Sequence, residues 1–430
     1  MARLWVWASL AVALLATTGC GNGDGAERRS QRAWTFMVYL DGDNDLEEAG
    51  VWDVNEMERV GSTDAVSIVV QFDRGPQVNG AGDWSTARRF LIAPDRDLQS
   101  ITSPLLMDLG EVDMASTQAL RGFVSWATSE FPADHYALVL WNHGAGWRSR
   151  SPGTGAAGGS RGIHFDDTSG TAMTMDGLRA ALSTLPARID LVAIDASLMG
   201  MLEVCYEIHD QTDYIVASEE SPPGTGYPYD VILSRLVADP EMTPADLGRV
   251  IVDAHVEAYP NYGVTQSLIE TARLPELCAR VDALAASIRS VLPSQEEAYF
   301  QALATSQAYA FAYYRDLFDF TRNARAAFSD DGVRQAADAV MQGIPGESGG
   351  PVLYERHNLP AVMNSHGLSI YLPRLGEFYG SYDSLRFNRD FPNWSRLLHD
   401  TAGSSAGRVK EQRAGHRSRS GSDTRAEGPL

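Results

Sequence analysis

Lysine is almost missing from this sequence. Lys410 is the only lysine among 430 residues, so arginine supplies nearly all of the positive charge. The 56 aspartates and glutamates outnumber the 35 lysines and arginines, which gives a formal net charge of −21 at pH 7. Binding to the phosphates of a nucleic acid requires a basic surface. The composition therefore argues against a nucleic-acid-binding protein, whereas an acidic surface can attract basic peptides.

Cysteine is scarce as well. Of the three cysteines, Cys20 follows an N-terminal apolar segment, and Cys205 and Cys278 occupy apolar positions of helix-like segments. Two cysteines in the body of the chain do not make a disulfide framework. We expect both of them to be buried thiols.

Long apolar runs are also lacking. Residues 4–16 form an apolar stretch, but it is well short of the about 20 residues that a membrane-spanning helix needs. Arg3 precedes this stretch and Thr17-Thr18-Gly19-Cys20 follows it, which is typical of a bacterial lipoprotein signal peptide. We predict that residues 1–20 are this signal, that Cys20 is lipidated, and that the protein is exported to the cell envelope. Thr17 stands where such signals usually have leucine, so secretion with cleavage nearby is the alternative.

The rest of the sequence divides by composition. Residues 21–32 are polar and Gly-rich, which indicates a flexible tether, and residues 402–430 have almost no large apolar side chain, which indicates a disordered tail. Between them, residues 33–401 alternate apolar runs with helical patterns. This alternation predicts one α/β body with a mostly parallel sheet covered by helices on both faces.

The individual elements can be placed from the same patterns. Strands are expected at residues 34–40, 66–72, 136–142, 190–194, 214–218 and 367–373. Helices are expected at residues 45–60, 116–131, 175–185, 198–208, 244–259, 274–292 and 295–311. The last three helices make an additional helical region toward the C-terminus.

Two strand ends carry residues suited to hydrolytic chemistry. His143-Gly144 follows one expected strand, and Asp195-Ala196-Ser197 follows another. Ligands of open α/β sheets bind at the carboxyl ends of strands, where a histidine and a nucleophile can approach each other. The amides of Gly144 and Ser197 can both face a developing oxyanion. Taken singly each motif is weak, because His-Gly is usually a turn and Asp-Ala-Ser is usually a helix N-cap.

Together and in this order, the motifs resemble the clostripain family of cysteine peptidases, which share the caspase–gingipain–legumain fold. The resembling segments cover most of the body and are WTFMVYLDGDNDLE, WNHGAGW, DDTSGTAMTMDGLRAAL, DASLMGMLEV, ASEESPPGTGYPY and HGLSIYLP. The resemblance implies a caspase-like, mostly parallel sheet flanked by helices. It also implies an endopeptidase that recognises peptides or proteins rich in arginine.

The resemblance gives each site residue a role. His143 is the proton-transfer residue, and Ser197 stands at the position of the nucleophilic cysteine. Asp195 lies in the pocket that selects arginine. An acidic partner is expected in the loop that follows, where Glu219 and Glu220 are the candidates.

Self-cleavage is a further property that the resemblance implies. Family members can cut themselves in the linker after the histidine, which here contains Arg148, Arg150 and Arg161. We expect any such cleavage to occur at one of these three arginines.

Ser197 is the departure that bears on activity. A thiol with an ordinary pKa of about 8.5 ionises readily beside an imidazole, whereas a serine needs a base that a third residue orients. We therefore expect impaired catalysis; the alternatives are an active Ser197/His143 peptidase that cleaves after arginine, and a protein that only binds peptides or partners. Cys205 is about 12 Å further along a helix and cannot replace the nucleophile. An α/β-hydrolase is excluded because Ser197 lacks the G-x-S-x-G motif and the histidine precedes it.

No metal ligand can be assigned from the sequence. Asp41, Asp43 and Asp45 alternate as in a calcium loop, but Leu46 and Trp52 occupy the sixth and twelfth positions, where glycine and glutamate are required. We interpret this segment as a turn and helix cap. Calcium is expected only through the resemblance to clostripain, a calcium-dependent enzyme.

Overall fold

The structure is a computed structural model that describes residues 32–76, 84–148 and 162–402. The predicted signal peptide with Cys20, residues 21–31 of the tether, Arg150, Arg161 and residues 403–430 lie outside the described residues. Among the helices that are described, none combines the length and the apolar character needed to cross a membrane.

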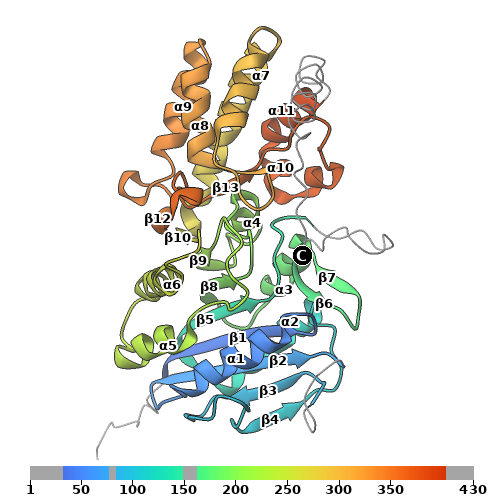
Figure 1. Ribbon diagram of the computed structural model, residues 1–430, viewed down its shortest axis with the longest axis vertical. Helices are drawn as coiled ribbons and strands as arrows, with labels where there is room; N and C mark the ends of the chain where they lie inside the picture. Colours follow the sequence, from blue (N-terminus) through green and yellow to red (C-terminus); the bar gives the residue numbers. More distant parts are fainter. Residues whose placement is uncertain (1–31, 77–83, 149–161, 403–430) are drawn as a thin grey trace, which may run out of the picture. The chain divides into compact units, whose positions relative to one another are not determined.

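In the described part of the chain, the centre is a nine-stranded sheet in the order β12-β10-β9-β8-β5-β1-β2-β3-β4 (Figure 1). Its parallel middle consists of β1 (Arg32–Gly42), β2 (Val66–Arg74), β5 (Ala133–Trp141), β8 (Ile189–Asp195) and β9 (Thr212–Ala217). The antiparallel edges are β3 (Arg88–Leu91), β4 (Leu105–Asp108), β10 (Thr265–Glu270) and β12 (Val352–His357). The predicted mostly parallel sheet is confirmed.

Helices cover both faces of this sheet and bury a separate core on each (Figure 1). Successive side chains of a strand point to opposite faces, and β1 follows this rule: Phe36 and Val38 enter one core, whereas Met37 and Tyr39 enter the other. The first core is closed by α1 (Glu47–Glu58), α5 (Tyr229–Ala238) and α6 (Pro244–Ala258). The second is closed by α2 (Thr117–Glu130), α3 (Met175–Leu182) and α4 (Leu202–Glu207).

The predicted additional helical region is also present toward the C-terminus, although the helix expected at 244–259 is α6 and packs on the central sheet instead. The region contains α7 (Leu274–Thr305), α8 (Leu317–Ala327), α9 (Asp331–Gln342), α10 (Arg386–Asp390) and α11 (Pro392–Ala402). The helices expected at 274–292 and 295–311 form the single element α7, which is kinked next to Pro293, where Gln295 leaves the helical conformation. A proline inside a helix removes one backbone hydrogen bond and clashes with the preceding turn, which explains the kink.

Two small sheets complete the described fold. The strand expected at 367–373 is β13 (Ser369–Tyr371), and it pairs with β11 (Tyr314–Asp316) rather than with the central sheet. The strands β6 (Ile163–Asp166) and β7 (Thr171–Met173) form a hairpin beyond the carboxyl end of β5.

Candidate active site

The carboxyl ends of β5 and β8 bring the predicted site residues together. Trp141 of β5 is in register with Asp195 of β8, so the residues that follow the two strands are neighbours. A Cβ atom built on Gly144 would lie 2.3 Å from the backbone oxygen of Ser197 and 2.9 Å from its nitrogen. Only glycine permits this approach. His143, Asp195 and Ser197 line one pocket of about 220 Å³.

The backbone after Asp195 does not enter a helix at once, which corrects the expected helix at 198–208. Leu198 has a φ of +65°, and α4 begins only at Leu202. A left-handed conformation at a residue with a side chain costs about 1–3 kcal/mol. Two features offset this cost: the Leu198 side chain is buried, and its amide donates to the carbonyl of Glu220 (3.2 Å). Ser197 therefore sits on a sharp turn at the mouth of the sheet.

Ser197 makes its hydrogen bond with the loop that follows β9. Its Oγ lies 2.8 Å from the Oγ of Ser221, and either hydroxyl can be the donor. Within the described residues no hydrogen bond joins Ser197 to His143, although both line the pocket. The nucleophile position is therefore held by another hydroxyl group.

Asp45 is a partner of His143 that the sequence reasoning missed. The His143 Nε2 atom lies 2.6 Å from the Asp45 Oδ1 atom. The helix cap that we expected in this segment is wrong, because the N-cap residue of α1 is Leu46, which makes no side-chain cap bond. The expected turn is present: the Asn44 Oδ1 atom accepts a hydrogen bond from the Leu46 amide (2.9 Å). Topology was the available signal, since β1 and β5 are parallel neighbours and the chain leaves both at the same edge.

Solvent weakens the contribution of this pair to stability. The side chain of Asp45 is 83% exposed and that of His143 is 40% exposed. Exposed ion pairs contribute about 0–1 kcal/mol. The carboxylate orients the imidazole more than it stabilises the fold.

Asp195 is buried at the wall of the pocket. Its Oδ2 accepts hydrogen bonds from the Tyr227 amide (3.0 Å) and the Tyr229 hydroxyl (2.9 Å). Asp195 therefore does not cap the following helix, because its side chain makes these two bonds and α4 begins only at Leu202. Burial raises the pKa of Asp195 to about 7, a shift that the two hydrogen bonds oppose.

A second buried carboxylate, Asp53 of α1, lies beside Asp195. A Cβ atom built on Gly226 would lie 2.8 Å from the Asp195 Oδ2 atom and 3.1 Å from the Asp53 Oδ2 atom. Trp141 Nε1 donates to the same Asp53 oxygen (2.6 Å). Burial, followed by the charge of Asp195, raises the pKa of Asp53. No pattern in the sequence points to Asp53, because its position is typical of a polar residue on a surface helix.

Glu219 and Glu220 do not line the pocket, which corrects their predicted place in the substrate site. Glu219 is buried beneath it, where its Oε2 accepts from the Gly367 amide (3.0 Å); burial and then the charge of Asp316 raise its pKa. Glu220 accepts from the amides of Ser221 (2.7 Å) and Ala310 (2.9 Å) through its Oε1. Both glutamates hold loops behind the site.

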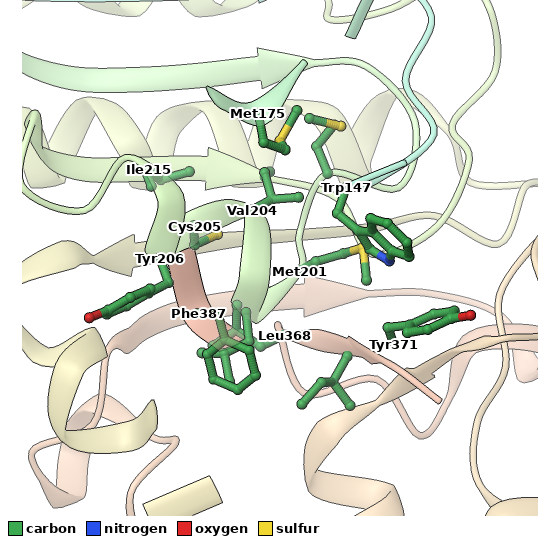
Figure 2. Close-up of a cluster of buried hydrophobic side chains, with 14 of the residues drawn as sticks. Trp147, Met175, Met201, Val204, Cys205, Tyr206, Ile215, Leu368, Tyr371 and Phe387 are labelled. Atoms are coloured by element: carbon green, nitrogen blue, oxygen red, sulfur yellow. The ribbon is translucent and has the colours of Figure 1, made fainter. Parts of the chain in front are cut away.

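The two body cysteines are buried thiols, as predicted. Cys205 and Cys278 are both fully buried, and Figure 2 shows Cys205 within a cluster of apolar side chains that includes Val204 and Ile215. Burial raises the pKa of both thiols. Neither can therefore act as a thiolate nucleophile in place of Ser197.

Arg148 is the one candidate for self-cleavage within the described residues. It is 2% exposed. Its guanidinium carbon lies 3.3 Å from the ring centre of Tyr379, and its Nη1 donates to the Tyr313 hydroxyl (2.6 Å). An arginine held between two tyrosines cannot enter a cleft, so Arg148 is not presented for cleavage in this conformation.

Among the described residues, one group of carboxylates could hold a metal ion. Asp43, Glu111 and Asp166 offer oxygen atoms that all lie within 4.8 Å of one another. Carboxylate oxygens are the ligands that calcium and magnesium prefer. These three residues therefore fit the calcium ion that the resemblance implies. One of them, Asp43, lies two residues before Asp45 in the sequence.

Comparisons with known proteins show the family of this chain. Residues 38–400 match the clostripain family. Over 228 residues the chain is 28% identical to clostripain from Hathewaya histolytica, a match that covers 47% of this chain and only 42% of that relative.

Solved structures show the same fold at lower identity. A secreted C11 cysteine protease from Bacteroides thetaiotaomicron, in complex with an irreversible peptide inhibitor, has a TM-score of 0.60 at 20% identity and covers 85% of this chain and 99% of that one. An inactive zymogen C11 protease from Parabacteroides distasonis has a TM-score of 0.61 at 21% identity, covering 84% and 99%. Because the family match extends over nearly all of the described residues, the chain belongs to the clostripain family.

Proposed function

We propose that this protein is an exported, envelope-anchored clostripain homologue that binds arginine-containing peptides, and that Ser197 impairs its peptidase activity. The observation that carries the proposal is the pocket that His143, Asp195 and Ser197 share. A peptide ligand is further supported by the similar C11 cysteine protease that was solved with a peptide inhibitor.

Asp195 supports arginine as the recognised side chain. Its Oδ2 is used by Tyr227 and Tyr229, whereas its Oδ1 has no hydrogen bond within the described residues. A guanidinium can donate a charge-assisted hydrogen bond to this free oxygen. Removing one partner of such a buried pair costs about 2–5 kcal/mol.

The hydrogen bond between Ser197 and Ser221 supports impaired catalysis. A serine attacks only when a base takes its proton during the reaction, and the base must be within hydrogen-bond reach. Here the partner of the Ser197 hydroxyl is another hydroxyl. A cysteine at this position would depend less on such contact, because a thiol ionises far more easily.

One observation favours the second candidate, an active serine peptidase. The bond from His143 to Asp45 supplies the third residue that a serine nucleophile requires. The amides of Gly144 and Ser197 also make no backbone hydrogen bond within the described residues, so both can donate to an oxyanion. Rotation of the Ser197 side chain away from Ser221 would complete this arrangement.

Turnover of a short arginyl reporter peptide divides the two candidates. The purified natural chain should be close to inert, Ser197→Cys should cleave after arginine, and His143→Ala in the Ser197→Cys background should abolish the gain. If the natural chain cleaves well and Ser197→Cys slows it, the serine peptidase is correct. If folded Ser197→Cys is as inert as the natural chain but binds the peptide, the protein is a binding protein only.

A further inference from the structure

A small two-stranded sheet connects the two loops of the candidate active site. The histidine loop (residues 142–148) follows β5, and the nucleophile turn (residues 196–201) follows β8. The strands β11 and β13 come from the later part of the chain and pair antiparallel, with Tyr314 opposite Tyr371. The first of these strands contacts the histidine loop, and the second contacts the nucleophile turn.

The histidine loop is held by β11. The hydroxyl of Tyr314, a fully buried residue, donates to the carbonyl of Ala145 (2.7 Å), which lies two residues after His143. The hydroxyl of the preceding Tyr313 accepts a hydrogen bond from the Arg148 Nη1 atom (2.6 Å) at the end of the loop. The path of the chain beyond His143 therefore depends on where β11 lies.

The nucleophile turn is held by β13. The amide of Ser369 donates to the carbonyl of Gly200 (2.8 Å), and the Ser369 Oγ atom donates to the same oxygen (3.2 Å). Gly200 lies three residues after Ser197. Further along β13, the Tyr371 amide donates to the Glu203 Oε1 atom (2.8 Å) in the first turn of α4. The turn that carries Ser197 is therefore fixed to β13 as the chain enters the helix.

The two loops also meet each other at this sheet. A Cβ atom built on Gly146 would lie 2.6 Å from the Met201 Sδ atom and 2.7 Å from the Tyr314 hydroxyl oxygen. The ring of Trp147 meets the ring of Tyr371 edge to face, with 5.1 Å between their centroids. Figure 2 shows the Met201 side chain next to the Trp147 ring. Side chains of both loops and of both strands therefore pack at one place.

We propose that the β11–β13 sheet sets the distance between His143 and the side chain at position 197, and that Tyr314 is a positioning residue for the histidine loop. The pairing of β5 with β8 fixes where the two loops begin, but a loop can still move beyond the end of its strand. A displacement of about 1 Å between reacting groups can cost about 100-fold in rate. This role rests on the proposed function, because it concerns the peptidase activity that Ser197→Cys should restore.

Tyr314→Phe in the Ser197→Cys background tests the proposal. The change removes one hydroxyl group and keeps the buried ring. We expect kcat for an arginyl reporter peptide to fall about tenfold, while KM changes less than about twofold, because the arginine pocket is untouched. Tyr354→Phe is the control, since its hydroxyl donates to Asp253 (2.8 Å), which lies in neither loop. That variant should leave kcat unchanged.

The thiol at position 197 gives a second readout that needs no turnover. Its alkylation by iodoacetamide, followed at that position by peptide mass spectrometry over a series of pH values, reports how readily the thiol ionises beside the imidazole. His143→Ala in the Ser197→Cys background defines the profile without an imidazole. We expect Tyr314→Phe to move the profile toward this limit. A loss of packing alone would lower Tm without moving the profile.

Two results would overturn the proposal. One is a folded Tyr314→Phe variant whose kcat and alkylation profile match those of the Ser197→Cys background. The other is an equal change in Tyr354→Phe, which would mean a general effect of losing a tyrosine hydroxyl. If Tyr314→Phe does not fold, Ser369→Ala, which removes the Oγ bond to Gly200, tests the same role from the other strand, and an unchanged profile there overturns it. A folded Ser197→Cys chain that cleaves nothing contradicts the proposed function, whereas the alkylation profile still decides the role of Tyr314.

Discussion

The carboxylate groups of Asp53 and Asp195 converge above the α-carbon of Gly226. The Oδ2 atoms of the two lie 2.8 Å (Asp195) and 3.1 Å (Asp53) from the position of a Cβ atom at residue 226. Two buried carboxylates at such short range cannot both be ionised without a large cost. Burial raises the pKa of both carboxyl groups, so Asp195 must lose its proton before it can pair with an arriving guanidinium as a carboxylate.

Arginyl peptides should therefore bind more tightly as the pH rises. Because the pKa of Asp195 is raised to about 7, the guanidinium meets an ionised partner mainly above that pH. We expect affinity to increase between about pH 5.5 and 8, by at most tenfold per pH unit. Calorimetry with an arginyl peptide and with the neutral citrullyl peptide checks this. Asp195→Asn should flatten the profile for arginine, and an equal loss for both peptides would remove Asp195 from the specificity site.

The same carboxylate should make the fold less stable at high pH. Its pKa in the folded chain is about 7 rather than 3.8, so the folded state holds a proton that the unfolded chain releases. This contribution to stability is complete below about pH 4 and is lost as the pH rises through about 7. The difference in Tm between Asp195→Asn and the natural chain should therefore be more favourable to the variant at pH 8.5 than at pH 5. A difference in Tm that is the same at both pH values would contradict the assignment.

Gly144→Ala should disrupt the site. The added methyl group would overlap the backbone of Ser197, at 2.3 Å from its oxygen, and backbone atoms cannot move aside as a flexible side chain can. We expect a loss of about 1–3 kcal/mol in the free energy of unfolding and a loss of arginyl-peptide binding. Gly122→Ala is the matched control, because nothing lies within 4 Å of its Cβ position in α2. That variant should be unchanged or stabilised by up to about 1 kcal/mol.

Asp45→Asn measures how far the imidazole depends on its carboxylate. In a serine peptidase with a complete triad, removing the aspartate lowers kcat by about 10⁴-fold. Asp45 is 83% exposed, so water can replace much of its effect, and we expect only a several-fold loss in the Ser197→Cys background. A loss near 10⁴-fold would show that Asp45 acts as a full third member and would favour the active serine peptidase.

Lipidation of Cys20 is tested on the mature N-terminus. The prediction comes from a short apolar segment that ends in small residues and a cysteine. Mass spectrometry of protein from a host competent for lipidation should find diacylglycerol on Cys20. A mature chain that begins at another residue and carries no lipid would contradict the prediction. In that case the Cys20→Ser variant would be found in the same cell fraction as the natural chain.

The sheet and the meeting of His143 with Ser197 could be predicted because both follow from alternating patterns and from strand ends. The roles of Asp45 and Asp53 could not be predicted from the sequence. Each looks like an ordinary polar residue near or within a helix, and its partner is almost a hundred positions away or more. The turn at Leu198 was missed for a related reason: the apolar spacing continues through it, while the amide of this left-handed residue donates its hydrogen bond to the carbonyl of the distant Glu220. Glu219 and Glu220 were wrongly predicted to lie in the substrate site, because the position of a residue in a loop does not show which way its side chain points.

The pairing of β5 with β8 has a consequence for a chain that has been cut. Residues 149–161 lie between these two strands in the sequence, yet the strands are hydrogen-bonded neighbours in the middle of the sheet. On the N-terminal side, Arg148 is clamped between two tyrosines of the later half. A protease that nicks this segment would therefore produce two bands on a denaturing gel but one particle by native size exclusion. The two fragments of the cut chain would separate only when the central sheet unfolds.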